Sequence, residues 1–342
     1  MHALVFRGVR DLRYEDVPTP ECPADGALIR VEAVGICGSD VHGYLGITGR
    51  RIPPMIMGHE FAGTIAALGA ATQGYTVGDR VAVFPYAHCE SCSACGEGRS
   101  NACSAKQFFG VLRTNGGMAE FAAVPTRVLF RLPDAASCTH GALAEPLSVA
   151  ARTVAKADRQ GSGATVVIGA GPIGLLCLLL LHAQGKKPVG VIDVNETRLT
   201  LARDLGAEWA WNPQGRTASD LTAERLSARG ADTVIEAVGI EATTAQAIEI
   251  VRPGGKLVIV GMLEPRIVVD MHTVVSKEIR IESSFLYSHA EFSSVLSQLP
   301  TLRAALDKIA SRTAPLENGP ELFARLAAGA EKACKVILTP DV

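Results

Sequence analysis

Four cysteines that lie close together in the sequence indicate a metal site. They form the pattern CxxCxxCx7C, which is made by Cys89, Cys92, Cys95 and Cys103. Four thiolates complete the tetrahedral shell of a zinc ion and leave no position open, which is the arrangement of a structural site. An iron–sulfur cluster is the alternative, but the bacterial ferredoxin pattern has three residues before its last cysteine and a proline after it. Because seven residues precede Cys103 and Ser104 follows it, we predict structural zinc.

A second group combines a thiol, an imidazole and carboxylates from three separate segments. Its members are Cys37 in GICGSDVH, His59 and Glu60 in GHEFAG, and Glu145 in EPL. Such a set can hold zinc with one position left for water or an alcohol oxygen, and an open position makes a zinc site catalytic. Taken singly, these residues have ordinary explanations as a buried thiol, a core histidine and a carboxylate at a helix start. Their occurrence together predicts a catalytic zinc site.

A glycine-rich turn after the apolar run Thr165–Ile168 predicts a dinucleotide-binding site. The pattern GxGxxG is formed by Gly169, Gly171 and Gly174, with Pro172 and Ile173 between the last two. The first glycine permits the tight turn, the second lets the backbone approach a pyrophosphate, and the third lets the helix pack closely on the strand. The helix that begins here supplies N–H donors and the positive end of its dipole. A glycine-rich turn without a ligand is the alternative.

The residue that ends the next expected strand, Asp193, bears on the choice of cofactor. A carboxylate at this place accepts hydrogen bonds from both hydroxyls of the adenosine ribose. Since its charge would repel a 2′-phosphate, NAD is favoured over NADP. Arg198, in the helix that follows, could lie near such a phosphate, although an arginine on a solvated helix face is the simpler explanation.

The elements that must position these residues change in character along the chain. Residues 1–155 show short β-type runs separated by Gly, Pro and Asp, at 27–31, 63–68 and 80–84, and predict a compact β domain. From residue 164 onward, strands alternate with helix-length segments, which predicts an α/β domain with a doubly wound parallel sheet over 156–289. Its expected strands are 165–168, 189–192, 233–236, 256–260 and 279–282, and its first helices reach about residue 184 and cover 197–205.

Charge and composition exclude several classes of partner. The chain has 33 Lys plus Arg against 35 Asp plus Glu, a formal net charge of -2, which gives no broad attraction for nucleic acid or an anionic membrane. Charges at Arg7, Arg10, Asp11 and Arg13 interrupt the run that a secretory signal would need. Residues 161–185 contain no charged side chain, but their glycines and proline predict a strand, a turn and a helix rather than a membrane span.

The cysteines outside the two metal sites are expected to be free thiols. In a chain without a signal, cytosolic reductants oppose disulfides, so cysteines are thiols or metal ligands. We expect a cytoplasmic protein and assign no site role to Cys22, Cys138, Cys177 and Cys334.

Together these segments resemble the zinc-containing medium-chain alcohol dehydrogenases, in the polyol branch that includes sorbitol, galactitol-phosphate and threonine dehydrogenases. The matching segments span the whole chain and are GICGSDVH (35–42), GHEFAG (58–63), VGDRV (77–81), the four-cysteine loop, EPLSVA (145–150), GAGPIG (169–174) and RPGGKLVIVG (252–261). The resemblance implies a GroES-like β-barrel catalytic domain, residues 1–155 completed by 290–342, and a Rossmann NAD-binding domain. It also implies two zinc ions per chain, and a homodimer or homotetramer paired through the sheet edge at 279–282.

The resemblance also implies how the catalytic zinc is held. Cys37 and His59 bind the metal directly. Glu60 is a ligand in polyol-type members and lies just behind the metal in others. Glu145 takes the place where many alcohol dehydrogenases carry a second cysteine, and it either holds the zinc-bound water or becomes a ligand. The sequence leaves open which carboxylate binds at which stage.

The implied reaction transfers hydride from a secondary alcohol to NAD. A bound zinc ion makes the alcohol oxygen alkoxide-like, as it lowers the pKa of coordinated water. In the relay of this family, Ser39 takes the hydroxyl proton and passes it through the nicotinamide ribose to His42. The imidazole of His42 can release it to solvent near neutral pH.

The substrate is less well defined by the sequence. Tyr44 and Phe109 resemble residues that line the substrate pocket in relatives. Sorbitol-type enzymes often carry Phe-Arg-Tyr where this chain has Phe-Leu-Tyr at 285–287, which weakens a strict sorbitol assignment. Recognition of a phosphate or carboxylate by Arg50 and Arg51 is the alternative, but we expect two solvated loop arginines.

Three alternatives therefore stand beside a polyol or small diol. The same chemistry could act on an amino alcohol such as threonine, or on a sugar-alcohol phosphate. A nucleotide-binding sensor or structural protein without catalysis is the alternative from another class. The joint presence of the metal and relay residues argues against that class.

Overall fold

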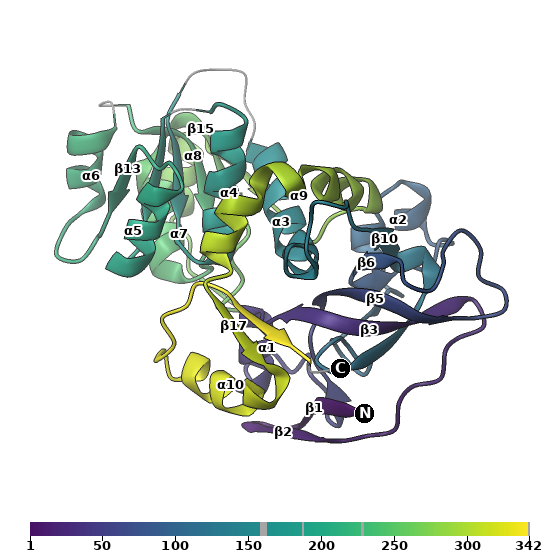
Figure 1. Cartoon of the computed structure of the whole chain (residues 1–342). Helices are drawn as coiled ribbons and strands as arrows, with labels where there is room; N and C mark the ends of the chain where they lie inside the picture. The colour runs from purple at the N-terminus through teal and green to yellow at the C-terminus, as the bar shows by residue number, and fades with distance from the viewer. Residues whose placement is uncertain (158–162, 187, 227–228, 341–342) are drawn as a thin grey trace. The chain divides into compact units, whose positions relative to one another are not determined.

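The chain forms two units, each with its own core (Figure 1). Unit 1 contains Met1–Glu145 and Ser288–Val342, and unit 2 contains Pro146–Tyr287. The computed structural model describes residues 1–157, 163–186, 188–226 and 229–340. Helix α3 (Cys138–Ala157) contains the point at which the chain passes from unit 1 to unit 2.

An antiparallel sheet with one parallel edge is the main element of unit 1. The strand order is β10-β6-β5-β3-β18-β17, with β9 also paired to β3. Its strands are β3 (Gly26–Gly35), β5 (Glu60–Leu68), β6 (Arg80–Val83), β9 (Phe121–Pro125), β10 (Leu129–Arg131), β17 (Arg312–Pro315) and β18 (Val336–Thr339). In β3, Ala27, Ile29 and Val31 are buried and Arg30 between them is exposed, as the period of two in a strand requires.

Two smaller sheets and short helices complete unit 1. The sheets are β2-β1-β4, with β1 (His2–Gly8), β2 (Asp11–Asp16) and β4 (Met55–Ile56), and the pair β7 (Tyr86–Ala87) and β8 (Gln107–Phe108). The helices are α1 (Gly38–Tyr44), α2 (Ser93–Gly96), α9 (His289–Ile309) and α10 (Gly319–Ala327), with 3-10 turns η1 (Ser100–Ala102), η2 (Thr126–Val128) and η3 (Leu316–Asn318).

The C-terminal segment packs onto the N-terminal part of unit 1. Helix α10 contacts α1 and β2, and β18 pairs with β3, so that the yellow end of the chain lies beside its purple beginning in Figure 1. Helix α9 is joined to α3 by a 2.9 Å hydrogen bond between His140 Nε2 and Asp307 Oδ1. Its first turn packs Phe292 edge-on against Phe84, at 5.5 Å between ring centroids.

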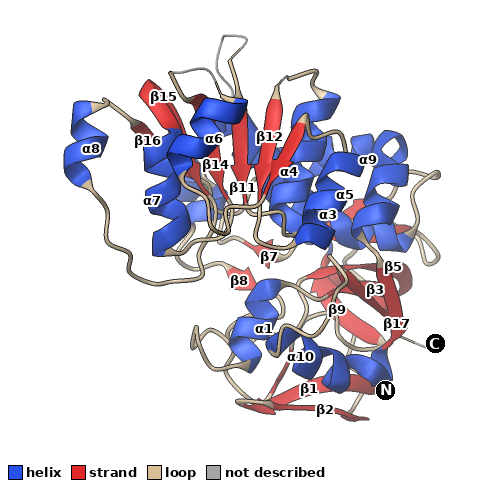
Figure 2. Ribbon diagram, turned by 90° about the vertical axis from the view of Figure 1, so that its left-hand side faces the viewer, coloured by secondary structure: helices blue, strands red, loops and turns tan. Residues whose placement is uncertain are grey.

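Unit 2 is a parallel sheet with helices, as predicted (Figure 2). Its strands are β11 (Thr165–Ile168), β12 (Val189–Ile192), β13 (Trp209–Trp211), β14 (Ala231–Glu236), β15 (Val251–Ile259) and β16 (Arg280–Ser283). Every pair is parallel, and the order β13-β12-β11-β14-β15-β16 is that of dinucleotide-binding folds. The helices are α4 (Pro172–Ala183), α5 (Glu196–Asp204), α6 (Ala218–Arg225), α7 (Glu241–Ile250) and α8 (Met271–Ser276).

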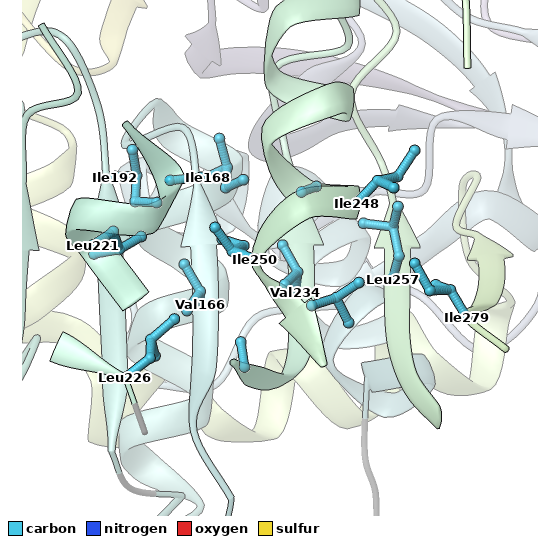
Figure 3. Packing of buried hydrophobic residues seen from close by; sticks show 14 of the residues in the cluster. Val166, Ile168, Ile192, Leu221, Leu226, Val234, Ile248, Ile250, Leu257 and Ile279 are labelled. Atoms are coloured by element: carbon cyan, nitrogen blue, oxygen red, sulfur yellow. The ribbon is translucent and has the colours of Figure 1, made fainter. Parts of the chain in front are cut away.

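Branched apolar side chains between the sheet and its helices form the core of unit 2 (Figure 3). Val166 and Leu257 of the strands pack with Leu221 of α6, Ile248 of α7 and Val274 of α8. Full burial of one such side chain contributes about 1.5–3 kcal/mol, so the cluster stabilises unit 2 without help from the metal sites.

The uncharged stretch near residue 170 forms β11, a turn and α4, which confirms the prediction from its glycines. Within the described residues, we find no helix with the length and apolar character needed to cross a membrane.

Candidate active site

Three side chains that can bind a metal come together in unit 1. One donor atom each of Cys37, His59 and Glu60 lie within 4.8 Å of one another. Strand pairing brings them together, because β3 and β5 are antiparallel and Gly35 lies opposite Glu60. Cys37 follows directly as the N-cap of α1. Gly35 is required here, since a Cβ atom at this residue would lie 2.1 Å from Glu60 Oε2.

The imidazole of His59 is buried between acidic groups. Its Nδ1 atom lies 3.6 Å from Asp40 Oδ1, and Asp40 has no exposed surface. Asp40 Oδ2 accepts a 3.2 Å hydrogen bond from the backbone N–H of Cys37. Burial by itself lowers the pKa of His59, but Asp40 and Cys37 outweigh it and raise the pKa well above its usual value.

Arg51 corrects our expectation of a solvated loop arginine. It is 6% exposed, and its Nη2 atom donates to Asp40 Oδ1 at 2.6 Å and to Ser39 Oγ at 3.2 Å. The prediction was wrong because the carboxylate of Asp40, eleven residues earlier, compensates the burial of the guanidinium. Burial raises the pKa of Asp40, but His59 and Arg51 together hold it well below its usual value. Arg50 is exposed, as expected.

Lys335 is a buried cation at this site that sequence reasoning missed. Its Nζ atom forms an ion pair with Glu60 Oε2, and both side chains are almost fully buried. Burial lowers the pKa of Lys335, yet the net shift is upward because Glu60, Cys37 and Glu145 surround it. The signal in the sequence was a lysine directly before the apolar strand β18.

The donor set fits a zinc ion. A cysteine sulfur, an imidazole nitrogen and a carboxylate oxygen lie within 4.8 Å of one another, and all three are ligand types that zinc binds in proteins. Glu145 is buried in α3 and acts electrostatically on Lys335, although it lies outside the group whose donors are within 4.8 Å. Cys37, His59 and Glu60 would hold the ion, with Glu145 near it.

The expected proton relay lies on one short helix next to these residues. Ser39 and His42 are three residues apart in α1, a spacing that places two side chains on one face of a helix. Both are partly exposed, whereas Asp40 between them points into the protein. Burial lowers the pKa of His42, which favours the neutral imidazole that can accept a proton.

The four cysteines of the loop lie at the separations that zinc requires. The Sγ atoms of Cys89 and Cys95 are 3.9 Å apart, those of Cys92 and Cys95 are 3.5 Å apart, and those of Cys103 and Cys89 are 3.5 Å apart. Tetrahedral thiolates at about 2.3 Å from zinc would be about 3.8 Å apart. All four are free thiols. Hydrogen bonds from Ser91 and other neighbours lower the pKa of Cys89 to about 6, which favours a thiolate ligand.

The glycine-rich turn of unit 2 has the geometry of a pyrophosphate site. Gly169 has a φ of 98°, which favours glycine, and a Cβ at Gly174 would lie 1.8 Å from the carbonyl oxygen of Gly169. At Gly171 an added Cβ would meet nothing within 4 Å, so the turn leaves open space at the N-terminus of α4. Gly171 is the N-cap, and Pro172 and Ile173 form the first turn of the helix, which has no side-chain cap.

Asp193 holds the turn from the end of β12. Its Oδ2 atom accepts from the backbone N–H of Ala170 at 2.7 Å, and Oδ1 accepts from that of Asn195 at 2.8 Å. The carboxylate therefore lies beside the expected pyrophosphate site. Arg198 is partly buried in α5, and its backbone N–H donates to the N-cap residue Asn195.

The two pocket candidates are buried in unit 1. Tyr44 packs edge-on against Phe323 of α10, at 5.7 Å between ring centroids. Phe109 lines a cavity of about 470 Å³ that also borders Met55 and Ile56. Among the described residues, we find no direct interaction of Tyr44 or Phe109 with the metal-binding group.

Comparison with known proteins gives the family. The model of the alcohol dehydrogenase GroES-like domain matches residues 23–134, and that of the zinc-binding dehydrogenases matches residues 172–300. A probable D-xylulose reductase A of Aspergillus fumigatus is 33% identical over 337 residues, which cover 96% of this chain and 94% of that protein. The chain belongs to the zinc-containing medium-chain alcohol dehydrogenases.

Other members of this dehydrogenase family are similar to the chain over most of its length. Sorbitol dehydrogenase of Bacillus subtilis is 36% identical over 293 residues, which cover 84% of this chain and 83% of that protein. The crystal structure of galactitol-1-phosphate dehydrogenase from Escherichia coli superposes with a TM-score of 0.92 at 28% identity, over 99% of this chain and all of that one. The chain is thus a zinc-dependent oxidoreductase of the polyol branch, with the predicted GroES-like and Rossmann folds.

Proposed function

We propose that the protein oxidises a secondary hydroxyl of a polyol or a small diol with NAD. The observation that carries the proposal is the grouping of Cys37, His59 and Glu60 beside a helix that bears Ser39 and His42. Relatives named xylulose reductase and sorbitol dehydrogenase act on substrates of this class by their names.

The residues of the site have distinct roles in this proposal. When bound, zinc would supply the Lewis acid and NAD would serve as the hydride acceptor. The hydroxyl of Ser39 takes the proton of the substrate alcohol as it gives up its own to the relay, and His42 at the end of the relay releases a proton to solvent. Glu145 would hold a water molecule at the metal site or become a ligand itself, whereas Lys335 holds Glu60 and balances its charge.

Asp193 supports NAD over NADP. Its carboxylate is fixed by two backbone N–H groups beside the open glycine turn, so it cannot easily move away from a ribose bound there. A 2′-phosphate at that ribose would meet this negative charge. Arg198 stays a candidate contact to the cofactor.

The structure supports recognition of a substrate phosphate less than the sequence did, because the sequence offered two candidate arginines. Arg51 is buried and donates hydrogen bonds to Asp40 and Ser39, whereas Arg50 is exposed. Only Arg50 is therefore free to contact a substrate phosphate. We therefore place polyols and diols before sugar-alcohol phosphates.

We further propose a cytoplasmic homodimer or homotetramer with a catalytic unit and an NAD-binding unit. Strand β16 lies at the edge of the sheet of unit 2, and Ile281 within it is 42% exposed. Nearby in sequence, Val268, Met271 and Val275 are more than half exposed. Pairing of two β16 edges about a two-fold axis would cover unpaired backbone groups and apolar side chains.

A substrate screen tests the proposed function. NADH formation is measured with sorbitol, butanediol, galactitol phosphate and threonine, with matched zinc content in each assay. We expect the highest kcat/KM with a polyol or diol. A clear preference for threonine or for the phosphate would assign the same chemistry to that substrate. Absence of turnover with all alcohols, together with tight NADH binding, would favour a sensor.

A further inference from the structure

The guanidinium of Arg51 joins two functional groups through one nitrogen atom. Nη2 donates to Ser39 Oγ at 3.2 Å and to Asp40 Oδ1 at 2.6 Å. The same Asp40 oxygen lies 3.6 Å from Nδ1 of His59. One side chain therefore connects the proposed proton acceptor with the carboxylate behind a proposed zinc ligand.

Burial makes this connection hard to replace. The side chains of Arg51 and Asp40 are 2% and 0% exposed, so water has little access to their ion pair. Removal of one partner would leave the other charge buried without compensation. The arrangement is therefore held in one geometry.

Two backbone segments, one in α1 and one around Arg51 itself, accommodate the arginine. A Cβ atom at Gly43 would lie 2.2 Å from Arg51 Cγ, so the glycine in α1 makes room for the stem of the arginine. The backbone on either side of Arg51 is hydrogen-bonded to Leu112. The N–H of Ile52 donates to the carbonyl of Leu112 at 3.1 Å, and the N–H of Leu112 donates to the carbonyl of Arg50 at 2.7 Å.

We propose that Arg51 is a positioning residue that fixes the Ser39 hydroxyl relative to Asp40 and His59. Because Ser39 Oγ accepts a hydrogen bond from Arg51, one lone pair is occupied and the direction of its own O–H is restricted. A substrate alcohol then meets a hydroxyl that is already oriented for proton transfer. The inference rests on the proposed function, in which Ser39 takes this proton.

The test compares Arg51→Gln and Arg51→Lys, with the exposed neighbour Arg50→Gln as the matched control and Ser39→Ala as the reference for a lost relay. The readouts are kcat, KM, the solvent deuterium isotope effect on kcat, zinc content and Tm. We expect Arg51→Gln to lower kcat by about 10–100-fold with KM little changed, because misplacement of a reacting group by 1 Å can cost about 100-fold. The isotope effect should rise, since proton transfer becomes slower relative to the other steps.

The lysine variant and Gly43 show whether position is what matters. Lysine keeps the charge and one nitrogen donor on a shorter side chain, so Arg51→Lys should recover part of kcat. Gly43→Ala should lower kcat by displacing the arginine, although alanine favours a helix. The double variant Gly43→Ala/Arg51→Gln should be no slower than Arg51→Gln alone, because both changes act through one side chain.

Different results separate the inference from the function on which it rests. Native kcat in Ser39→Ala would remove the relay and this inference with it. A lowered kcat in Ser39→Ala together with a native kcat in Arg51→Gln would overturn the inference about Arg51 but leave the proposed function standing. Loss of zinc in proportion to kcat in Arg51→Gln would also overturn it, because Arg51 would then support only the metal site.

Discussion

At the scale of single residues, the proposed metal site contains charges that are buried in pairs. Asp40 with Arg51 is an almost fully buried ion pair next to the proposed ligand His59, and Glu60 with Lys335 is one that includes a proposed ligand. Such pairs add little net stability compared with apolar residues, but removal of one partner is costly. Their value here is geometric, since one pair fixes Asp40 beside His59 and the other fixes Glu60 itself.

Asp193 provides a prediction at this scale. Asp193→Ala should weaken NAD binding roughly 10–100-fold, because the ribose loses a charged acceptor and the turn at Ala170 loses its anchor. It should also reduce the preference for NAD, since a 2′-phosphate no longer meets a negative charge. The measurement is the ratio of kcat/KM for the two cofactors. A native protein that already prefers NADP would contradict this role of Asp193.

The residue scale is also where the sequence was least informative. The cysteine loop could be predicted because its spacing is set by ligand chemistry. Cys37 and His59 could be predicted because they occur together with other ligand types in motifs that resemble those of a known family. The burial of Arg51 and Lys335 could not, because it depends on partners that the fold brings from distant segments. Lys335 meets Glu60 only after β18 has paired with β3, which in turn pairs with β5.

At the scale of elements, strand periodicity predicted unit 2 better than unit 1. Strands β11 and β12 form at the predicted residues, because buried parallel strands are short apolar runs between turns. The long pairing of β3 with β5 contains register shifts between Leu28 and Ile29 and between Val31 and Ala33. Alternation in the sequence does not reveal such shifts, although they set the register that places Gly35 opposite Glu60.

The cysteine loop is predicted to be structural. Cys92→Ser should lose one zinc ion and destabilise the protein by roughly 3 kcal/mol, a decrease in Tm of about 6–12 °C. The zinc that remains should support turnover. Zinc analysis with thermal unfolding measures both effects, and Cys334→Ser is the control outside the loop. Unchanged Tm after loss of that zinc would show that the loop does not need the metal.

The first turn of α9 gives a prediction for pH. Burial and the neighbouring His88 lower the pKa of His289 to about 4. In the unfolded chain its pKa is about 6.5, so between pH 6.5 and 4 the unfolded state binds the proton and the folded state does not. The free energy of unfolding should therefore fall as pH decreases through this range. His289→Phe keeps a ring against Phe84, which lies 4.1 Å from the imidazole between ring centroids, and it cannot take up a proton.

Urea unfolding at pH 7 and pH 5 measures this effect. The decrease in midpoint should be smaller for His289→Phe than for the native protein, while the exposed histidine variant His272→Gln should behave as native. An equal decrease in all three proteins would contradict the assignment to His289.

At the scale of the whole molecule, the edge of the sheet in unit 2 is the proposed contact between copies of the chain. Ile281→Asp should yield a monomer, because it places a charge in the apolar contact and two copies would bring two charges together. Light scattering at micromolar concentration measures the mass. Val9→Asp, at an exposed apolar residue of unit 1, should leave the oligomer intact. A native protein that is monomeric would remove the proposal.

In the proposed function, Cys37, His59 and Glu60 hold a zinc ion on which turnover depends. The most direct test of this role is zinc content per chain, measured with NADH formation from a polyol or diol in the native protein and in His59→Ala. We predict two zinc ions per native chain, and one zinc with turnover abolished in His59→Ala, because the remaining cysteine site is closed. Two zinc ions and native turnover in His59→Ala would contradict the account.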